Sequence, residues 1–321
     1  MAEATLTQPG STVDWTADAA YSAGAVIQLP DGRAGVVSVD VASGAVVGVN
    51  VDGIYTVAKT LTMVLLEGGR AYWDHSANKA HYKKVNDRDL YMGRVVEDAA
   101  SAATTCKVAL NANPPDDIDL SRDPALSVIA GTAAAAGFGY PVRLGGASIL
   151  ELTATNEAQK VDLLSADGFA LGAKAIAEFQ FRVLSDGGSG AQDLSVAVAS
   201  GTHTTDFESV AEFVGVHLDG NDVNIYIESD DGTTDVAPVD STIDYTEGVA
   251  VAQRVEVWID MRDTSDVQVY VNGVLVLGAT TFTLAAAAGP LFLIAHLEKT
   301  ATTDVYKVAI DAARVRYAQA R

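Results

Sequence analysis

The stretch DTSDVQVYVNGVLVLGATTF, residues 263–282, decides the fold class. Valine alternates with other residues at positions 267, 269 and 271, and again at 274 and 276. Between the two runs stands Asn272-Gly273, and both residue types adopt the positive φ angles that a type I′ turn requires at its central positions. The sequence therefore predicts a β-hairpin here.

Similar alternating runs fill the chain on both sides of this hairpin, from about residue 147 onward. In AIAEFQFRVL, for example, Phe179, Phe181 and Val183 alternate with polar residues, as expected when one sheet face is buried and the other is wet. About a dozen such runs predict a two-sheet jelly roll over residues 146–321.

The first half of the chain has the same texture in shorter pieces. Gly, Asp and Pro punctuate its strand-like runs, which are AGAVIQL, RAGVVSVDV, AVVGVNV, IYTVAK, LTMVLLE, RAYWD, YMGRVVED and TTCKVAL. This pattern leaves no room for a long helix and predicts a small β-barrel or sandwich over residues 21–112, so that the whole protein is all-β. Residues 1–20 are polar and predict a loose N-terminal arm, and the turn-rich residues 113–145, with Pro114-Pro115, predict a linker.

Charge is distributed unevenly along the chain. The protein has 42 acidic and 21 basic residues, a net charge of −21. Residues 1–112 hold 12 acidic and 9 basic residues, whereas residues 146–321 hold 26 and 10. Because nucleic-acid binding draws its affinity from Lys and Arg, the second half is expected to repel nucleic acid, and its charge favours solubility.

Cys106 is the only cysteine, so an intrachain disulfide is excluded. It lies in the strand-like run TTCKVAL without a His or Asn motif, and we expect a buried, inert thiol rather than a nucleophile. The N-terminus lacks a basic and an apolar signal region, and no run approaches about 18 apolar residues. These features predict cytoplasmic synthesis and no membrane insertion.

The strongest enzymatic pattern is VEVWIDMRD, where Glu256 and Asp260 share one face of a predicted strand. Two acids four residues apart on a strand lie roughly 13 Å apart. Glycoside hydrolysis needs about 5 to 9.5 Å between its carboxyl groups. The chain also lacks a phosphate-binding G-x-x-x-x-G-K-[ST] loop and a G-x-S-x-G elbow. We therefore expect no enzyme activity, no catalytic residues, no cofactor and no metal.

Several residues nevertheless have two readings. Trp258 and Tyr270 are weak candidates for a glycan-stacking platform, although covering the sheet face or a subunit contact is the favoured interpretation. The ESDDGTTD acids could ligate Ca²⁺ but lack EF-hand spacing, so a solvated turn is expected. The acids concerned in ESDDGTTD are Asp230, Asp231 and Asp235. The five histidines, His75, His81, His203, His217 and His296, show no metal-binding spacing. We interpret the pair in DHSANKAH, His75 and His81, as incidental rather than as an intersubunit metal site.

Two families resemble these patterns. The run from Gly24 to Val57, followed by Tyr72-Trp73-Asp74, resembles the small β-domains of tailed-phage capsid decoration, or cement, proteins. The runs ELTATNEAQKVDLLSAD, AEFQFRVL, QRVEVWIDMRDTSDVQVYVNGVLV and KVAIDAARVRYA resemble concanavalin A-like (laminin G-like) jelly rolls, which serve as lectins, glycosidases or passive spacers.

The first resemblance implies a structural protein of the bacteriophage virion. Such a protein is made in the host cytoplasm, binds the major capsid protein on the outer surface of the assembled head as a homotrimer, and stabilises the head. Here it would also display an acidic jelly roll. The alternative is a carbohydrate-binding or host-attachment module on the virion whose second domain grips a surface glycan.

The N-terminal arm offers candidate capsid contacts. Residues 2–15 carry apolar side chains in an otherwise unpatterned segment, namely Leu6, Val13 and Trp15. An extended segment of this kind can gain order by adding a strand to an exposed sheet edge. We therefore expect the arm to add a strand to a capsid subunit.

Overall fold

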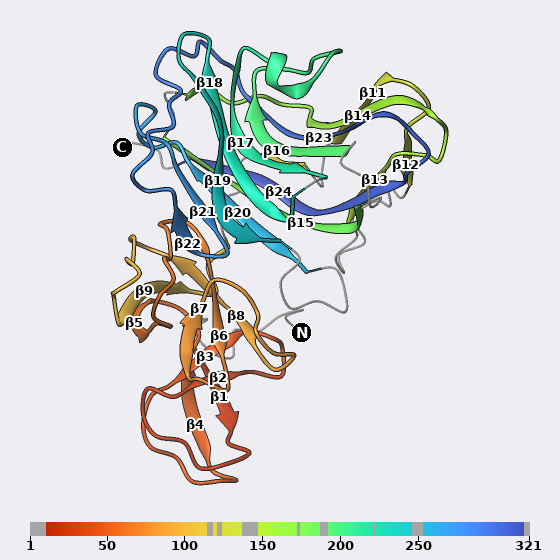
Figure 1. Ribbon diagram of the computed structural model, residues 1–321. Coiled ribbons are helices and arrows are strands. Elements are labelled where there is room, and N and C mark those ends of the chain that lie inside the picture. The colour runs from red at the N-terminus through yellow and green to blue at the C-terminus, as the bar shows by residue number, and fades with distance from the viewer. Residues whose placement is uncertain are drawn as a thin grey trace, which may run out of the picture. The chain divides into compact units, whose positions relative to one another are not determined.

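The computed structural model describes residues 11–113, 118–120, 124–136, 147–171, 174–186, 192–220, 222–245 and 253–317. The chain divides into two compact units, Met1–Pro115 and Asp116–Arg321, each shown in Figure 1. Both are built from antiparallel strands, which confirms the all-β prediction. Within the described ranges, no helix has the length and apolar character needed to span a bilayer.

The first unit contains two antiparallel sheets. The four-stranded sheet has the order β1 (Thr12–Thr16), β4 (Val46–Asn50), β3 (Ala34–Val37), β2 (Val26–Gln28). The five-stranded sheet has the order β5 (Ile54–Ala58), β9 (Thr105–Leu110), β8 (Leu90–Val95), β6 (Arg70–Asp74), β7 (Lys79–His81). The predicted strands between residues 21 and 112 are therefore present, apart from LTMVLLE, where only the isolated bridge Leu65–Ala99 forms.

Asn111 joins the two sheets of this unit. Its amide Nδ2 donates to the backbone oxygens of Ala34 (2.9 Å) and Val51 (2.8 Å), and its Oδ1 accepts from the Ala34 N–H (2.9 Å). Asn111 has a φ of 56°, a left-handed conformation that asparagine tolerates better than most residues. One side chain thus satisfies three backbone groups just past the end of β9.

The predicted N-terminal arm is wrong where the structure describes it. Residues Thr12–Thr16 form β1, which pairs with β4 of the same chain. Val13 and Trp15 pack on the buried cluster of the four-stranded sheet, and Trp15 lies 5.5 Å from the Tyr21 ring. These side chains therefore complete the chain's own sheet, because β4 offers an unpaired edge nearby. Leu6 lies outside the described residues.

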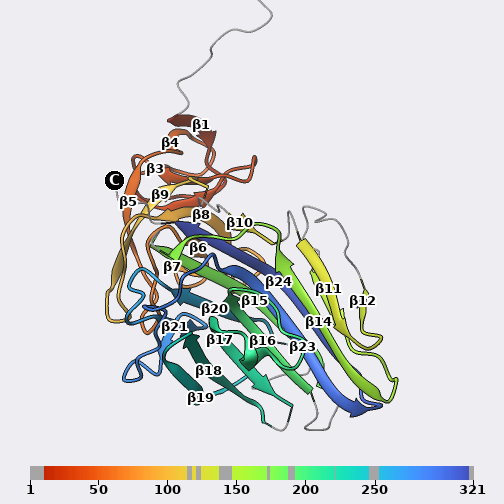
Figure 2. The ribbon, with the colours of Figure 1, turned by 90° about the horizontal axis from the view of Figure 1, so that it is seen from above.

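The second unit is a pair of facing sheets, whose long strands β14, β23, β15 and β24 run along one diagonal in the view of Figure 2. The larger sheet has the order β12 (Ala134–Ala136), β13 (Ser148–Glu151), β24 (Tyr306–Tyr317), β15 (Ala175–Asp186), β20 (Val255–Asp260), β21 (Gln268–Val271), β22 (Val274–Val276), with β10 (Ile118–Asp119) also paired to β24. The seven-stranded sheet has the order β11 (Pro124–Ala130), β14 (Glu157–Ser165), β23 (Phe292–Thr302), β16 (Gln192–Ala199), β17 (Glu212–Asp219), β18 (Asn224–Asp231), β19 (Asp235–Asp244).

One continuous apolar core fills the space between these sheets. It includes Val161 and Leu163 of β14, Phe179 and Phe181 of β15, and Val257 of β20, all with 0% exposure. Phe179 and Phe181 therefore point inward, as their alternation predicts. The other face of the seven-stranded sheet carries polar residues and, beside them, a small apolar cluster that includes Ala197, Phe213 and Ile294.

The hairpin at residues 263–282 forms as predicted. Asn272 and Gly273 have φ angles of 50° and 80°, and Val269 pairs with Val276 and Val271 with Val274. Val274 is 46% exposed, however, and lies in β22, the edge strand of its sheet.

The predicted linker, residues 113–145, is wrong in its extent. β10, β11 and β12 all lie within it, and each pairs with a strand of the second unit. Turn-forming residues around these short strands conceal their alternation. β19 is also unpredicted, because an edge strand with a polar, mostly exposed pattern and Pro238 in its middle carries no period-2 signal.

Candidate functional site

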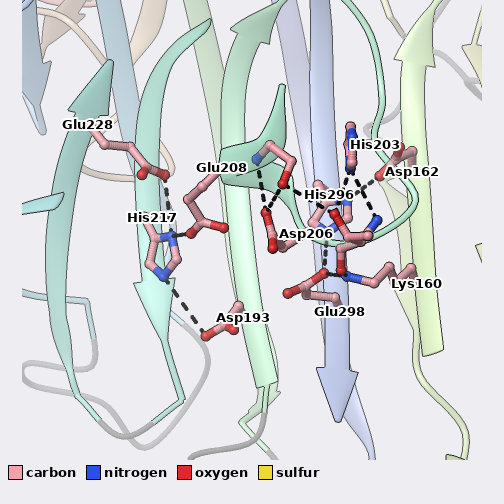
Figure 3. Close-up of polar contacts among 12 residues, drawn as sticks. Lys160, Asp162, Asp193, His203, Asp206, Glu208, His217, Glu228, His296 and Glu298 are labelled. Carbon is pink, nitrogen blue, oxygen red and sulfur yellow. Dashed lines mark hydrogen bonds and ion pairs between the residues drawn. The ribbon is translucent and has the colours of Figure 1, made fainter. Parts of the chain in front are cut away.

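The seven-stranded sheet turns a polar face away from the core. A single row of aligned side chains crosses five of its strands on this face, in the order Asp162, His296, Ser195, His217, Tyr226. Their neighbours in sequence are apolar and lie in the core, as the period-2 geometry of a strand requires. Two histidines that stand 79 positions apart in sequence thus lie on one face (Figure 3).

The segment between β16 and β17 folds back over this face. It contains a short 3₁₀ turn, η2 (Phe207–Ser209), whose N-cap Asp206 accepts from the Ser209 N–H at 2.9 Å. Phe207 is 2% exposed and packs on a small apolar cluster with Phe213, 4.9 Å between ring centroids. Phe207 thus anchors the segment and places Glu208 over the sheet.

His296 is the centre of one buried network. Its Nδ1 lies 2.5 Å from Asp162 Oδ1 and its Nε2 lies 3.1 Å from Glu298 Oε2, while Lys160 pairs with Glu298. Burial alone lowers the pKa of His296, but the hydrogen bonds to Asp162 and Glu298 raise it to about 9. The imidazole is therefore protonated at neutral pH and balances part of the surrounding carboxylate charge.

His217 is the centre of a second network. Its Nδ1 lies 3.1 Å from Glu208 Oε1 and 3.3 Å from Glu228 Oε1, and its Nε2 faces Asp193 at 3.9 Å. Burial again lowers the pKa of His217, but the hydrogen bonds to Glu208 and Glu228 raise it to about 10. Burial raises the pKa of Asp193 to about 6, against the opposing attraction of His217.

Glu208, His217 and Glu228 form a set of metal-ligand type. One ligand atom from each lies within 4.8 Å of the other two, and the three come from η2, β17 and β18. Glu228 is 2% exposed, whereas the Glu208 side chain is 42% exposed. The Glu228 side of the cluster is therefore buried against the sheet, whereas the Glu208 side is accessible to solvent.

Sequence reasoning missed this cluster. His217 in EFVGVHLD and Glu228 in VNIYIESDD each alternate with apolar residues, so each was assignable to a polar sheet face. Which polar residues meet depends on strand order and register, and on the return of residue 208 over the sheet. Those are tertiary properties that alternation along a single strand does not encode.

The predicted aromatic pair is assembled but buried. Trp258 and Tyr270 are cross-strand partners with ring centroids 6.0 Å apart, and they are only 5% and 6% exposed. Trp258 Nε1 donates to Glu256 Oε1 at 2.8 Å. A sugar-stacking platform needs open ring faces, and the rings of this pair are buried.

The two acids of VEVWIDMRD lie in one row beside Trp258, as predicted. Glu256 also accepts a hydrogen bond from Gln180 Nε2 at 3.2 Å. Asp260 pairs with Arg262, 2.6 Å between Arg262 Nη2 and Asp260 Oδ2. Each carboxylate thus has a hydrogen-bonding partner within its own sheet region.

The ESDDGTTD acids divide into two kinds. Asp231 is 3% exposed, and its carboxylate accepts from the backbone N–H groups of Thr233, Thr234 and Ala286. Burial opposes its ionisation, but these donors outweigh burial and lower its pKa. The expectation of a solvated turn is therefore wrong for Asp231, which holds the β18–β19 turn against residues 283–286, whereas Asp235 is exposed.

The histidines and the cysteine of the first unit lie apart from any ligand set among the described residues. His81 is 7% exposed on β7 and stacks on Tyr82, while His75 is exposed at the preceding turn. Cys106 is free and buried, as predicted, and burial raises its pKa to about 11.

Comparisons with solved structures find carbohydrate-recognition folds at low similarity. The Emp47p carbohydrate recognition domain has 15% identity and a TM-score of 0.43, covering 63% of this chain and 93% of its own. The carbohydrate-binding module CBM66 from Bacillus subtilis has 11% identity and a TM-score of 0.33, covering 60% of this chain and 94% of its own. A comparison with curated proteins found no significant match.

A family model gives a more specific result for the first unit. The model described as phage cement protein matches residues 7–110. This range contains all the described strands of that unit, from β1 to β9. Residues 7–110 are thus similar to the phage cement protein family, and the second unit is a pair of facing antiparallel sheets.

Proposed function

We propose that this protein decorates a phage capsid: its first unit binds the outer surface of the assembled head, stabilises it, and carries the acidic second unit. The match of residues 7–110 to the phage cement family carries this proposal. The family is described as phage cement protein, and the first unit is compact enough to act as one binding body.

The proposed mechanism is mechanical and involves no bond-making. A small domain that bridges neighbouring capsid subunits buries area only in the assembled lattice, so its binding shifts the equilibrium toward the intact shell by mass action. A homotrimer on the major capsid protein would link three weak contacts and gain avidity without new chemistry.

Exposed aliphatic side chains on the first unit support a contact surface there. Val46 on β4 is 67% exposed and Ile54 on β5 is 63% exposed. Large aliphatic groups left in water gain free energy when a partner covers them, at roughly 25 cal/mol per Å². They replace the N-terminal arm as the positions to test, because Val13 and Trp15 complete the chain's own sheet.

Co-sedimentation with purified heads that lack the protein tests the proposal. The wild-type chain should pellet with heads and delay their thermal disruption. Val46→Asp or Ile54→Asp should weaken binding, whereas Val274→Asp, at a position 46% exposed on the second unit, should not. A wild-type chain that stays in the supernatant at saturating head concentration would rule the proposal out, and imaging of bound particles would locate the protein.

A further inference from the structure

We propose that Glu208, His217 and Glu228 bind one Zn²⁺ ion, which fastens the segment of residues 200–211 to the polar face of the seven-stranded sheet. The inference concerns the second unit and does not depend on capsid binding. Figure 3 shows the three side chains converging from β17, β18 and the covering segment.

The spacing of the ligand atoms matches a tetrahedral site. His217 Nδ1 lies 3.1 Å from Glu208 Oε1 and 3.3 Å from Glu228 Oε1. Zinc binds nitrogen and carboxylate oxygen at about 2.0 to 2.2 Å, which places ligand atoms about 3.3 Å apart along the edges of a tetrahedron. The two glutamate oxygens lie within 4.8 Å of each other, so an ion that displaces the Nδ1 proton, which is released to solvent, can sit among the three atoms.

The donor types favour zinc over calcium or magnesium. One imidazole nitrogen and two carboxylates suit a borderline ion of the first transition row. Calcium takes six to eight oxygen ligands, and magnesium prefers an octahedron of oxygens that includes several waters. Three protein ligands with one open side are the number that zinc accepts when water occupies its fourth position.

A second observation concerns a residue beside His217 on the same sheet face. Ser195 is 1% exposed, and its Oγ has no hydrogen-bond partner among the described residues. Ser195 is the direct cross-strand partner of His217, so both side chains lie on the same face as neighbours. A buried hydroxyl normally finds a partner, so a water molecule is expected in this row of side chains beside His217.

The remaining nitrogen of His217 also has a suitable neighbour. Nε2 faces the Asp193 carboxylate at 3.9 Å on the side away from the two glutamates. Histidines that bind a metal through one ring nitrogen commonly present the other to a carboxylate, which fixes the ring orientation. Asp193 is thus placed to orient His217 while Nδ1 binds the ion.

Binding would connect parts of the chain that the sheet alone does not join. Glu208 belongs to η2, whose anchor in the structure is Phe207, while His217 and Glu228 are fixed by strand pairing. An ion shared among the three would hold the covering segment closed. Protease cleavage after Phe207 should therefore slow when the ion is bound.

Titration calorimetry with Zn²⁺ on the full-length, EDTA-treated protein tests the site, with Co²⁺ absorption as a report on coordination. We expect one ion per chain with micromolar or tighter affinity, and a visible Co²⁺ spectrum that Zn²⁺ abolishes. Glu208→Gln should weaken Zn²⁺ binding at least about tenfold, and it should fold normally because its side chain is 42% exposed. Glu228→Gln, at the buried ligand, should have a similar or larger effect.

The matched control is Asp235→Asn, which removes the same charge from the adjacent strand β19 without touching the three ligands. It should change the affinity by less than about twofold, since loss of one exposed charge is worth little. Absence of micromolar Zn²⁺ binding overturns the proposal, as does wild-type affinity in both glutamate variants or a loss in Asp235→Asn as large as theirs. Chymotrypsin cleavage after Phe207 that Zn²⁺ does not slow overturns the fastening role.

Discussion

The side chain of Lys299 connects separate backbone segments of the second unit. It is 3% exposed, and its ammonium donates to the backbone oxygens of Thr153, Thr155, Thr302 and Asp304. Four carbonyl oxygens around one positive group resemble the coordination of a metal cation. The ammonium thereby ties the chain before β14 to the connection between β23 and β24.

We predict that Lys299→Met lowers the free energy of unfolding by about 3 kcal/mol, because it leaves four backbone carbonyl groups without this donor. Urea denaturation followed by circular dichroism measures the change. Lys307→Met is the control, because Lys307 pairs with Glu151 at 3.0 Å on a partly exposed surface, and its loss should cost less than about 1 kcal/mol. Equal losses in the two variants would contradict the role given to the carbonyl cage.

His296 makes the stability of the second unit depend on pH. Its pKa is raised from 6.5 to about 9 in the folded protein, so the folded state holds the proton more tightly than the unfolded chain does. The resulting stabilisation is complete below about pH 6.5 and is lost as the pH rises toward 9. Asp162, Glu298 and Lys160 are the charged groups that face the ring network.

We predict that unfolding free energy falls by up to about 3 kcal/mol between pH 6.5 and 9 through His296 alone. The measurement is denaturant unfolding at several pH values for the wild type and for His296→Gln. The variant should be less stable at pH 6.5 and should have a shallower slope over this range, because one of the titrating groups is gone. Identical slopes for the two proteins would show that the proton on His296 does not contribute.

At the scale of elements, β8 illustrates a local constraint in the first unit. Its pairing with β6 shifts register between Ala71 and Tyr72, so that Met92 is an extra residue on β8 and forms a bulge. Gly93 follows with a φ of 152°, and a Cβ built there would lie 2.0 Å from the Ala109 backbone oxygen. The neighbouring strand β9 therefore passes too close for any side chain.

We predict that Gly93→Ala destabilises the first unit by about 3 kcal/mol, because backbone atoms of β9 must move to admit the methyl group. Thermal unfolding of the full-length protein measures the effect. Gly32→Ala is the matched control, with a φ of 87° and no atom within 4 Å of the built Cβ. It should cost only about 1 kcal/mol, from the backbone conformation alone. A Gly93→Ala protein as stable as the control would contradict the close approach.

At the scale of the whole molecule, the two units differ in charge. Residues 1–115 carry 12 acidic and 9 basic residues, whereas residues 116–321 carry 30 and 12. Charged networks such as those of His217 and His296 neutralise only a small part of this excess. In the proposed arrangement, the second unit would give a decorated particle a strongly negative coat.

We predict that decorated heads migrate faster toward the anode than undecorated heads at pH 7, and that they aggregate less at low ionic strength. Electrophoretic light scattering measures both samples. The difference should shrink as the pH approaches 4.4, the isoelectric point of the sequence, because the carboxylates become protonated there. Equal mobility at pH 7 for fully occupied and bare particles would contradict the proposed outward display of the second unit.

The sequence by itself determined the fold class, the hairpin at Asn272-Gly273 and the inward face of strands such as β15, because these depend on residues adjacent along one strand. It also identified the family resemblance of the first unit. Edge strands were missed or misplaced, as with β1 in the predicted arm and β11 in the predicted linker. These strands lie at sheet edges among turn-forming residues, so their short alternation is hard to distinguish from a loop.

Only the tertiary structure decided which polar residues meet. Glu208, His217 and Glu228 come from three elements, and the order and register of β17 and β18 bring two of them together. The third arrives because Phe207 finds an apolar cluster on the outer face of the sheet. Strand order and loop packing are set by the free energy of the whole core, and no local pattern in the sequence records that sum.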